Sequence, residues 1–189
     1  MSIRSRVGKL ATVAAIGWIT VTMTAFAQGE KMTEQVQESG YTTPFSLQHG
    51  GEKIDVMVRV KDKERGYYFY LVFVEKQDSP QEKKDHLRRL YQGSLMLDAN
   101  TTPYPVKLRF QLDSVDGKNG VHIDKVVSER DPIYGTRYAK GDTEIWRAHS
   151  IHYAGLEPGV YRVRIENLVS APEIDFETLF QFERDNRKY

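Results

Sequence analysis

The side chains with the most chemistry to offer are five histidines, of which only His149 and His152 lie close together in the sequence. The segment around them is predicted to be extended, and residues three apart on a regular strand point to opposite faces. Without a bulge, the two imidazoles cannot bind one metal ion. The chain has no cysteine, and no carboxylate pair lies beside these histidines at a spacing typical of metal ligands. We therefore predict no metal site.

The usual catalytic motifs are also absent. A serine hydrolase needs a nucleophile, a histidine and an orienting acid, and the sequence contains no Gly-x-Ser-x-Gly motif. Ser150 follows His149, but neighbours on a strand face away from each other. Glycine-rich phosphate-binding motifs are missing as well. We predict no catalytic residues, no cofactor and no enzymatic activity. An envelope hydrolase stays open as an alternative, because two carboxylates could still face each other across a cleft.

The best candidates for binding lie in and just after the segment 128–143, which has no clean periodicity and is predicted to be a long loop. The candidate binding residues are Arg130, Tyr134, Arg137, Tyr138 and Trp146. Tyrosine, tryptophan and arginine are enriched at binding hot spots, and loops at the end of a β-sandwich often carry recognition. The alternative is an ordinary loop whose tyrosines fold back onto the domain.

A second aromatic feature is the run Tyr67–Tyr70. Strand alternation sends Tyr67 and Phe69 to one face, and Tyr68 and Tyr70 to the other. Each sheet of a sandwich has one inner face, so the second pair needs another environment. We expect the helix or a loop to cover it; the alternative is an exposed patch that binds a partner.

These side chains must be positioned by a predominantly β fold. Strands are predicted over 54–60, 67–74, 106–112, 121–127, 145–154, 160–165 and 174–183, from their alternation and the turn residues between them. One short helix is predicted at about 80–92, with Ser79 as the N-cap and Pro80 in the first turn. We predict one domain over 45–189, an antiparallel immunoglobulin-like β-sandwich of seven or eight strands. Residues 28–44 are polar and are predicted to be a flexible leader.

Residues 1–27 are predicted to be a signal peptide. Arg4, Arg6 and Lys9 form a basic head, an apolar stretch follows, and residues 25–27 read Ala-Phe-Ala. We expect cleavage near Ala27 and a periplasmic or secreted protein without a stable membrane anchor; a retained anchor is the alternative. Removing the three basic residues from 27 leaves 24 against 26 acidic residues. A chain this close to neutral is a poor candidate for binding nucleic acid.

The segment from Leu156 to Val163, Leu-Glu-Pro-Gly-Val-Tyr-Arg-Val, resembles the turn and penultimate strand of immunoglobulin and fibronectin-type sandwiches. The resemblance implies that Tyr161 packs at a corner of the fold. Together with the signal peptide, the strand at 67–74 and the sequence Leu-Arg-Arg-Leu at 87–90, this segment also resembles an uncharacterised family of exported proteobacterial sandwich proteins. That family includes candidates for immunity against toxins injected by neighbouring bacteria.

The sequence therefore leads us to expect a non-enzymatic periplasmic binding module. Its partner would be a protein of the envelope or an incoming toxin, the latter making it an immunity protein. A module that binds a small ligand, either a lipid or a carbohydrate, through its aromatic faces is the first alternative.

The signal peptide is directly testable. In a Gram-negative host, protein recovered from the periplasm should begin at Gln28, because the small residues at 25 and 27 fit signal peptidase. N-terminal sequencing and intact mass would measure this. Membrane-bound protein that keeps residues 1–27 would instead support a retained anchor.

Overall fold

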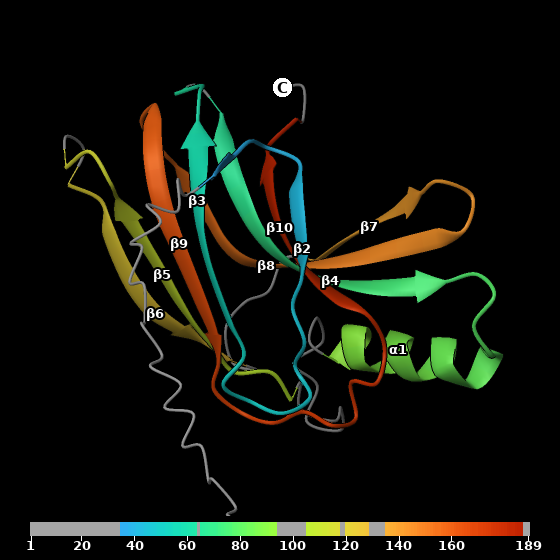
Figure 1. The fold of residues 1–189 in the computed structure, drawn as a ribbon. Helices are drawn as coiled ribbons and strands as arrows, with labels where there is room; N and C mark the ends of the chain where they lie inside the picture. The colour runs from blue at the N-terminus through green and yellow to red at the C-terminus, as the bar shows by residue number, and fades with distance from the viewer. Residues whose placement is uncertain (1–34, 64, 94–104, 118–119, 129–134, 187–189) are drawn as a thin grey trace, which may run out of the picture. The chain divides into compact units, whose positions relative to one another are not determined.

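The computed structural model describes residues 35–186, apart from 64, 94–104, 118–119 and 129–134. In these residues the chain forms two five-stranded sheets (Figure 1). Sheet 1 contains, in spatial order, β1 (Val36–Gln37), β3 (Lys53–Val60), β9 (Gly159–Asn167), β5 (Leu108–Ser114) and β6 (His122–Val127). Sheet 2 contains β2 (Tyr41–Pro44), β10 (Thr178–Arg184), β4 (Gly66–Lys76), β8 (Glu144–Gly155) and β7 (Gly135–Lys140). All pairs are antiparallel except β1 with β3.

The core lies between the inner faces of the two sheets. Phe69 of β4 contacts Phe110 of β5 across it, with ring centroids 5.2 Å apart, and Phe182 of β10 lies beside both Phe69 and Tyr67. These aromatic side chains are fully buried. Such rings remove large apolar areas from water, so this packing of sheet 1 against sheet 2 supplies the main hydrophobic stabilisation.

The predicted sandwich is confirmed, and the structure adds three strands to the seven predicted. The leader prediction is wrong for 36–44, because β1 and β2 there pair with β3 and β10. The loop prediction is wrong for 135–140, which form β7 at the edge of sheet 2. Alternation failed to reveal β7 because most of its residues are exposed on both faces. The last predicted strand begins at Thr178 rather than at 174.

Tyr161 occupies the corner position that the resemblance implied. Its ring is fully buried, and its hydroxyl donates a hydrogen bond to the carbonyl oxygen of Glu157, four residues earlier, at 2.7 Å. This bond fixes the turn between β8 and β9 to the start of β9.

Helix α1 (Gln81–Gly93) packs on the inner face of sheet 2, beside the end of β4 (Figure 1). Leu87, Leu90 and Tyr91 join the main core, and the Tyr91 ring stacks on His149 of β8 at 4.4 Å. The helix therefore does not cover the outer tyrosines, and that part of the expectation is wrong. No helix among the described residues is long and apolar enough to cross a membrane.

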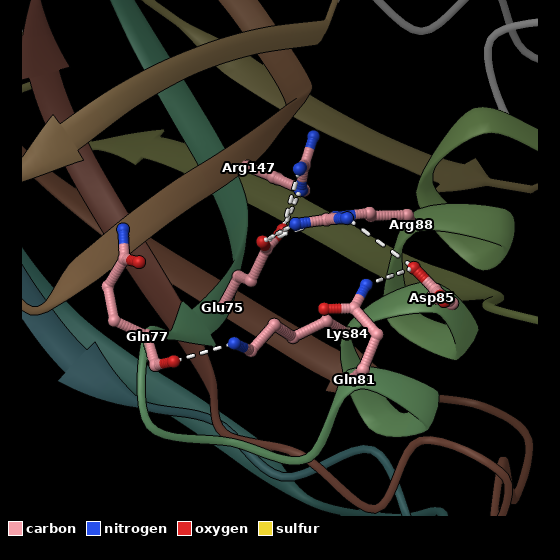
Figure 2. A network of polar contacts seen from close by, with 7 residues as sticks. All are labelled: Glu75, Gln77, Gln81, Lys84, Asp85, Arg88 and Arg147. Atoms are coloured by element: carbon pink, nitrogen blue, oxygen red, sulfur yellow. Dashed lines mark hydrogen bonds and ion pairs between the residues drawn. The ribbon is translucent and has the colours of Figure 1, made fainter.

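A buried carboxylate holds α1 in place (Figure 2). Glu75 of β4 is 4% exposed and accepts hydrogen bonds from Arg88 of α1, at 2.5 Å, and from Arg147 of β8, at 2.6 Å. Burial raises the pKa of Glu75, but the hydrogen bonds from both arginines outweigh it and leave the pKa below its usual value. Asp85 contacts Arg88 at 3.4 Å, so two carboxylates balance two guanidinium groups in this network.

Removing the charge of Glu75 should destabilise the fold, because Arg147 would then be buried without a carboxylate partner. We expect Glu75→Gln to lower the free energy of unfolding by about 3 kcal/mol, measured by urea denaturation. The control is Asp55→Asn, which breaks an ion pair with Arg162 whose side chains are more than 40% exposed and should cost less than about 1 kcal/mol. Equal losses in the two variants would contradict a special role for the buried network.

Candidate functional site

A β-bulge brings the two histidines to the same face. Phe69 of β4 pairs with His152, but the next residue, Tyr70, pairs with Ser150, so Ile151 is the extra residue of β8. His149 then lies opposite Leu71, on the inner face with His152. Both rings pack among aromatic side chains. The described residues contain no group of three or more side chains suited to hold a metal ion.

Burial keeps both imidazoles neutral over a wide pH range. It lowers the pKa of His149 to about 3, against a smaller opposing effect of a hydrogen bond to the Tyr91 backbone. Burial and the charge of Lys125 lower the pKa of His152 to about 4. Neutral rings embedded between the sheets serve the packing of the core.

The outer face of sheet 1 is a surface of cross-strand ion pairs. These pairs are Arg162 with Asp55, Arg164 with Asp113, Arg109 with Asp124, and Lys53 with Glu166. Hydrogen bonds from Arg109 and Gln111 lower the pKa of Asp124 to about 2. The charges on this face satisfy one another, which makes it a well-solvated surface.

The outer face of sheet 2 is aromatic. Tyr68 stacks on Tyr70, with ring centroids 4.9 Å apart and planes within 11°, and contacts Tyr153 of β8 at 4.5 Å. Tyr68 and Tyr70 are half-buried, and Tyr153 is 45% exposed. The end of this row depends on a glycine: a Cβ at Gly66 would lie 2.1 Å from the Tyr153 hydroxyl. We call Tyr68, Tyr70 and Tyr153 the tyrosine row.

The hairpin of β7 and β8 curls over the other half of this face. Tyr138 of β7 donates a hydrogen bond to Gln181 of β10 at 2.6 Å, although three strand spacings, about 14 Å on a flat sheet, separate their strands. Tyr138 and Trp146 thereby pack over Val72 and Val74, which are buried. Among the described residues, strand β7 rather than the helix or a loop packs on this face, and Tyr68 and Tyr70 stay half-buried, so the expected cover by a helix or a loop is wrong.

The curled face encloses an open groove of about 650 Å³. Tyr68 and Tyr70 line one side, Tyr138 and Lys140 of β7 another, and residues 181 and 183–186 the third. Lys140 lies over the ring of Trp146, with its Nζ 4.7 Å from the ring centroid. The groove therefore combines aromatic walls with a few hydrogen-bonding groups, as ligand and partner sites commonly do.

Two of the predicted binding residues are brought together here. Tyr138 and Trp146 lie on the outer face with ring centroids 6.0 Å apart. Arg137 pairs with Arg147 in the β7–β8 register and so belongs to the opposite face of the sheet, where its side chain is exposed. Arg130 and Tyr134 lie outside the described residues.

Sequence reasoning missed Tyr153, Gln181 and Glu183 as parts of this surface. Gln181 and Glu183 alternate with the core residues Phe180 and Phe182, so their outward direction was readable from the sequence. Their proximity to β7 was not, because it depends on the curl of the sheet. The bulge at Ile151 was equally hidden.

The buried histidines predict an acid-sensitive fold. Unfolded histidine titrates near pH 6.5, whereas the native pKa of His149 is about 3. Below pH 6.5 the unfolded chain therefore binds protons that the native chain does not. The free energy of unfolding then decreases as the pH is lowered. At pH 4.5 the His149 imidazole should account for a decrease of about 2–3 kcal/mol in the free energy of unfolding.

Denaturation curves between pH 7.5 and 4.5, compared for wild type and His149→Gln, would measure this effect. The variant should lose less stability on acidification than wild type, whatever its stability at neutral pH. His49→Gln, at an exposed position, is the control and should follow wild type. Identical pH dependence of wild type and His149→Gln would contradict the assignment.

Comparison with known proteins adds a structural neighbour and a family. No curated protein matches the chain at a significant level. One similar solved structure is that of a protein from Sulfurospirillum deleyianum; it is 13% identical, with a TM-score of 0.48, and the match covers 79% of this chain and 99% of the other. A family model described as a domain of unknown function, DUF5625, matches residues 42–184, from β2 to the end of β10. The chain thus belongs to the DUF5625 family.

Proposed function

We propose that this protein is an exported, non-enzymatic binding module that recognises another protein through the outer face of sheet 2. The observation that carries the proposal is the tyrosine row beside the groove. The expected signal peptide supports export, and places the partner in the envelope or among proteins that enter it.

The tyrosine row is suited to protein recognition because it is ordered before binding. Tyr68 is held between Tyr70 and Tyr153, so these rings lose little side-chain entropy when a partner covers them. Tyrosine combines a large apolar ring with a hydroxyl that can hydrogen-bond at the rim. A row of pre-ordered tyrosines therefore provides much of what a binding hot spot needs.

The contrast between the two outer faces supports the choice of surface. On sheet 1 the arginines are engaged with carboxylates, and a partner would have to displace these ion pairs. On sheet 2 the row is held by contacts between rings, and among the described residues no ion pair has to be displaced for a partner to cover its exposed part. Burying apolar surface is the dominant favourable contribution to protein association.

A small-ligand module is the second candidate, and the groove is the observation that favours it. Its volume of about 650 Å³ falls within the range of small-molecule sites. A thermal-shift panel of oligosaccharides and lipids tests this candidate. A ligand that stabilises wild type but not Tyr70→Ala would support the candidate over protein recognition.

The experiment that tests protein recognition is site-specific photo-crosslinking in living cells. A photoreactive phenylalanine analogue placed at Tyr153 should give a defined adduct with one protein, identified by mass spectrometry. The same analogue at Arg162, on the outer face of sheet 1, is the matched control and should give no such adduct. Adducts of equal yield at both positions would contradict recognition through sheet 2.

Affinity for the purified partner then tests the row itself. Tyr68→Ala should weaken binding by about tenfold or more, as truncation of a hot-spot residue does. Gly66→Ala should also weaken binding, because its new methyl group displaces the Tyr153 ring. Arg162→Ala is the control. Circular dichroism would check that each variant is folded, and unchanged affinity in both folded row variants would remove the row from the interface.

A toxin delivered by a neighbouring bacterium is the specific partner class that would make this protein an immunity factor. Deleting its gene should then sensitise the cell to that toxin. Survival of the deletion strain under attack would remove this class and leave envelope proteins as partners.

A further inference from the structure

Of the two acidic residues that line the groove, Asp185 is buried and Glu183 is the more exposed. Glu183 lies on the outer face of β10, directly opposite Tyr68 of β4, and Gln181 lies opposite Tyr70 in the same register. Glu183 and Gln181 both line the groove. The register therefore places a carboxylate beside the middle ring of the tyrosine row.

The hydrogen bonds of Glu183 come from amides. Its Oε2 accepts from Nε2 of Gln181 at 3.1 Å, and its Oε1 accepts from Nδ2 of Asn186 at 3.3 Å. The Gln181 amide is itself held by Tyr138, whose hydroxyl donates to its Oε1. This chain of bonds orients the carboxylate. A carboxylate has about four acceptor positions, so these two bonds leave room for further donors.

The other charged groups that line the groove are engaged elsewhere. Arg184 forms an ion pair with Asp62, Lys140 lies over the Trp146 ring, and Asp185 is buried, with 5% of its surface exposed. Within the described part of the chain, Glu183 has no ion pair. Among the described residues, it is therefore the half-buried acidic group of the groove that forms no ion pair.

We infer that the groove receives a cationic side chain, arginine or lysine, from the partner protein; this inference rests on the proposed function. A guanidinium or ammonium group there would pair with the Glu183 carboxylate through charge-assisted hydrogen bonds. The adjacent tyrosines would add cation–π attraction and contact with the aliphatic part of the side chain. Because several rings border the carboxylate, such a pair would be partly shielded from water, which strengthens it.

Small probes can test the inference without the partner. Wild-type protein would be titrated with N-acetyl-arginine amide, or with N-acetyl-citrulline amide, which has nearly the same shape but no charge. Binding would be followed by NMR chemical shifts of residues 66–70, 135–140 and 181–186. The arginine probe should shift these residues, and the citrulline probe should bind about fivefold more weakly or worse.

The variant that isolates the charge is Glu183→Gln, which keeps the size of the side chain. It should weaken binding of the arginine probe by about fivefold or more, because charge-assisted hydrogen bonds to the carboxylate are lost, and leave binding of the citrulline probe unchanged. Glu166→Gln, on the outer face of sheet 1, is the control and should bind as wild type does. The inference is overturned if the arginine probe produces no shifts at the groove, if citrulline binds equally well, or if Glu183→Gln has no effect on the arginine probe.

The partner identified by crosslinking separates this inference from the proposed function. If Tyr68→Ala weakens binding of that partner and Glu183→Gln does not, the inferred cation site is wrong and recognition through sheet 2 stands. If neither variant weakens it, the proposed function fails too. If both weaken it, an alanine scan of the partner should find one arginine or lysine whose loss has no additional effect in the Glu183→Gln background.

Discussion

The structure depends on β4, a central strand that is apolar on both faces. Its inner residues Tyr67, Phe69 and Phe73 are buried between the sheets, while Tyr68 and Tyr70 form the row on the outer face. Glu75, the last but one residue of the same strand, holds α1 through Arg88. Strand β4 thus contributes residues to the core, to the contact with the helix and to the candidate site. Hydrophobic packing holds this strand rigidly, so the tyrosines on its outer face are also fixed in position.

The curl of sheet 2 converts a flat aromatic face into a groove. The bulge at Ile151 increases the local twist of β8, and the bond from Tyr138 to Gln181 joins the edge of the sheet to β10. The hydrophobic cluster of Val72, Val74 and Trp146 fills the space beneath the hairpin. The tyrosine row and Glu183 then border the part of the face that the hairpin leaves open.

The strands with one buried face were predictable, because alternation between core and solvent is a local property of the sequence. Strand β7 was not, since its residues are largely exposed and its pairing with β8 stabilises it. The outward direction of Tyr68 was predictable in the same way, but its contact with Tyr153 was not. That contact, the bulge and the burial of Glu75 beside Arg147 all depend on the register between distant strands, which no local pattern encodes.

The central claim is that sheet 2, and not sheet 1, carries the interface. Hydrogen–deuterium exchange of the protein, measured alone and with the purified partner that crosslinking identifies, tests this most directly. We predict slower exchange on binding at residues 66–70, 135–140 and 181–186, with unchanged exchange at 53–60 and 108–114. Slower exchange confined to the strands of sheet 1 would contradict the account.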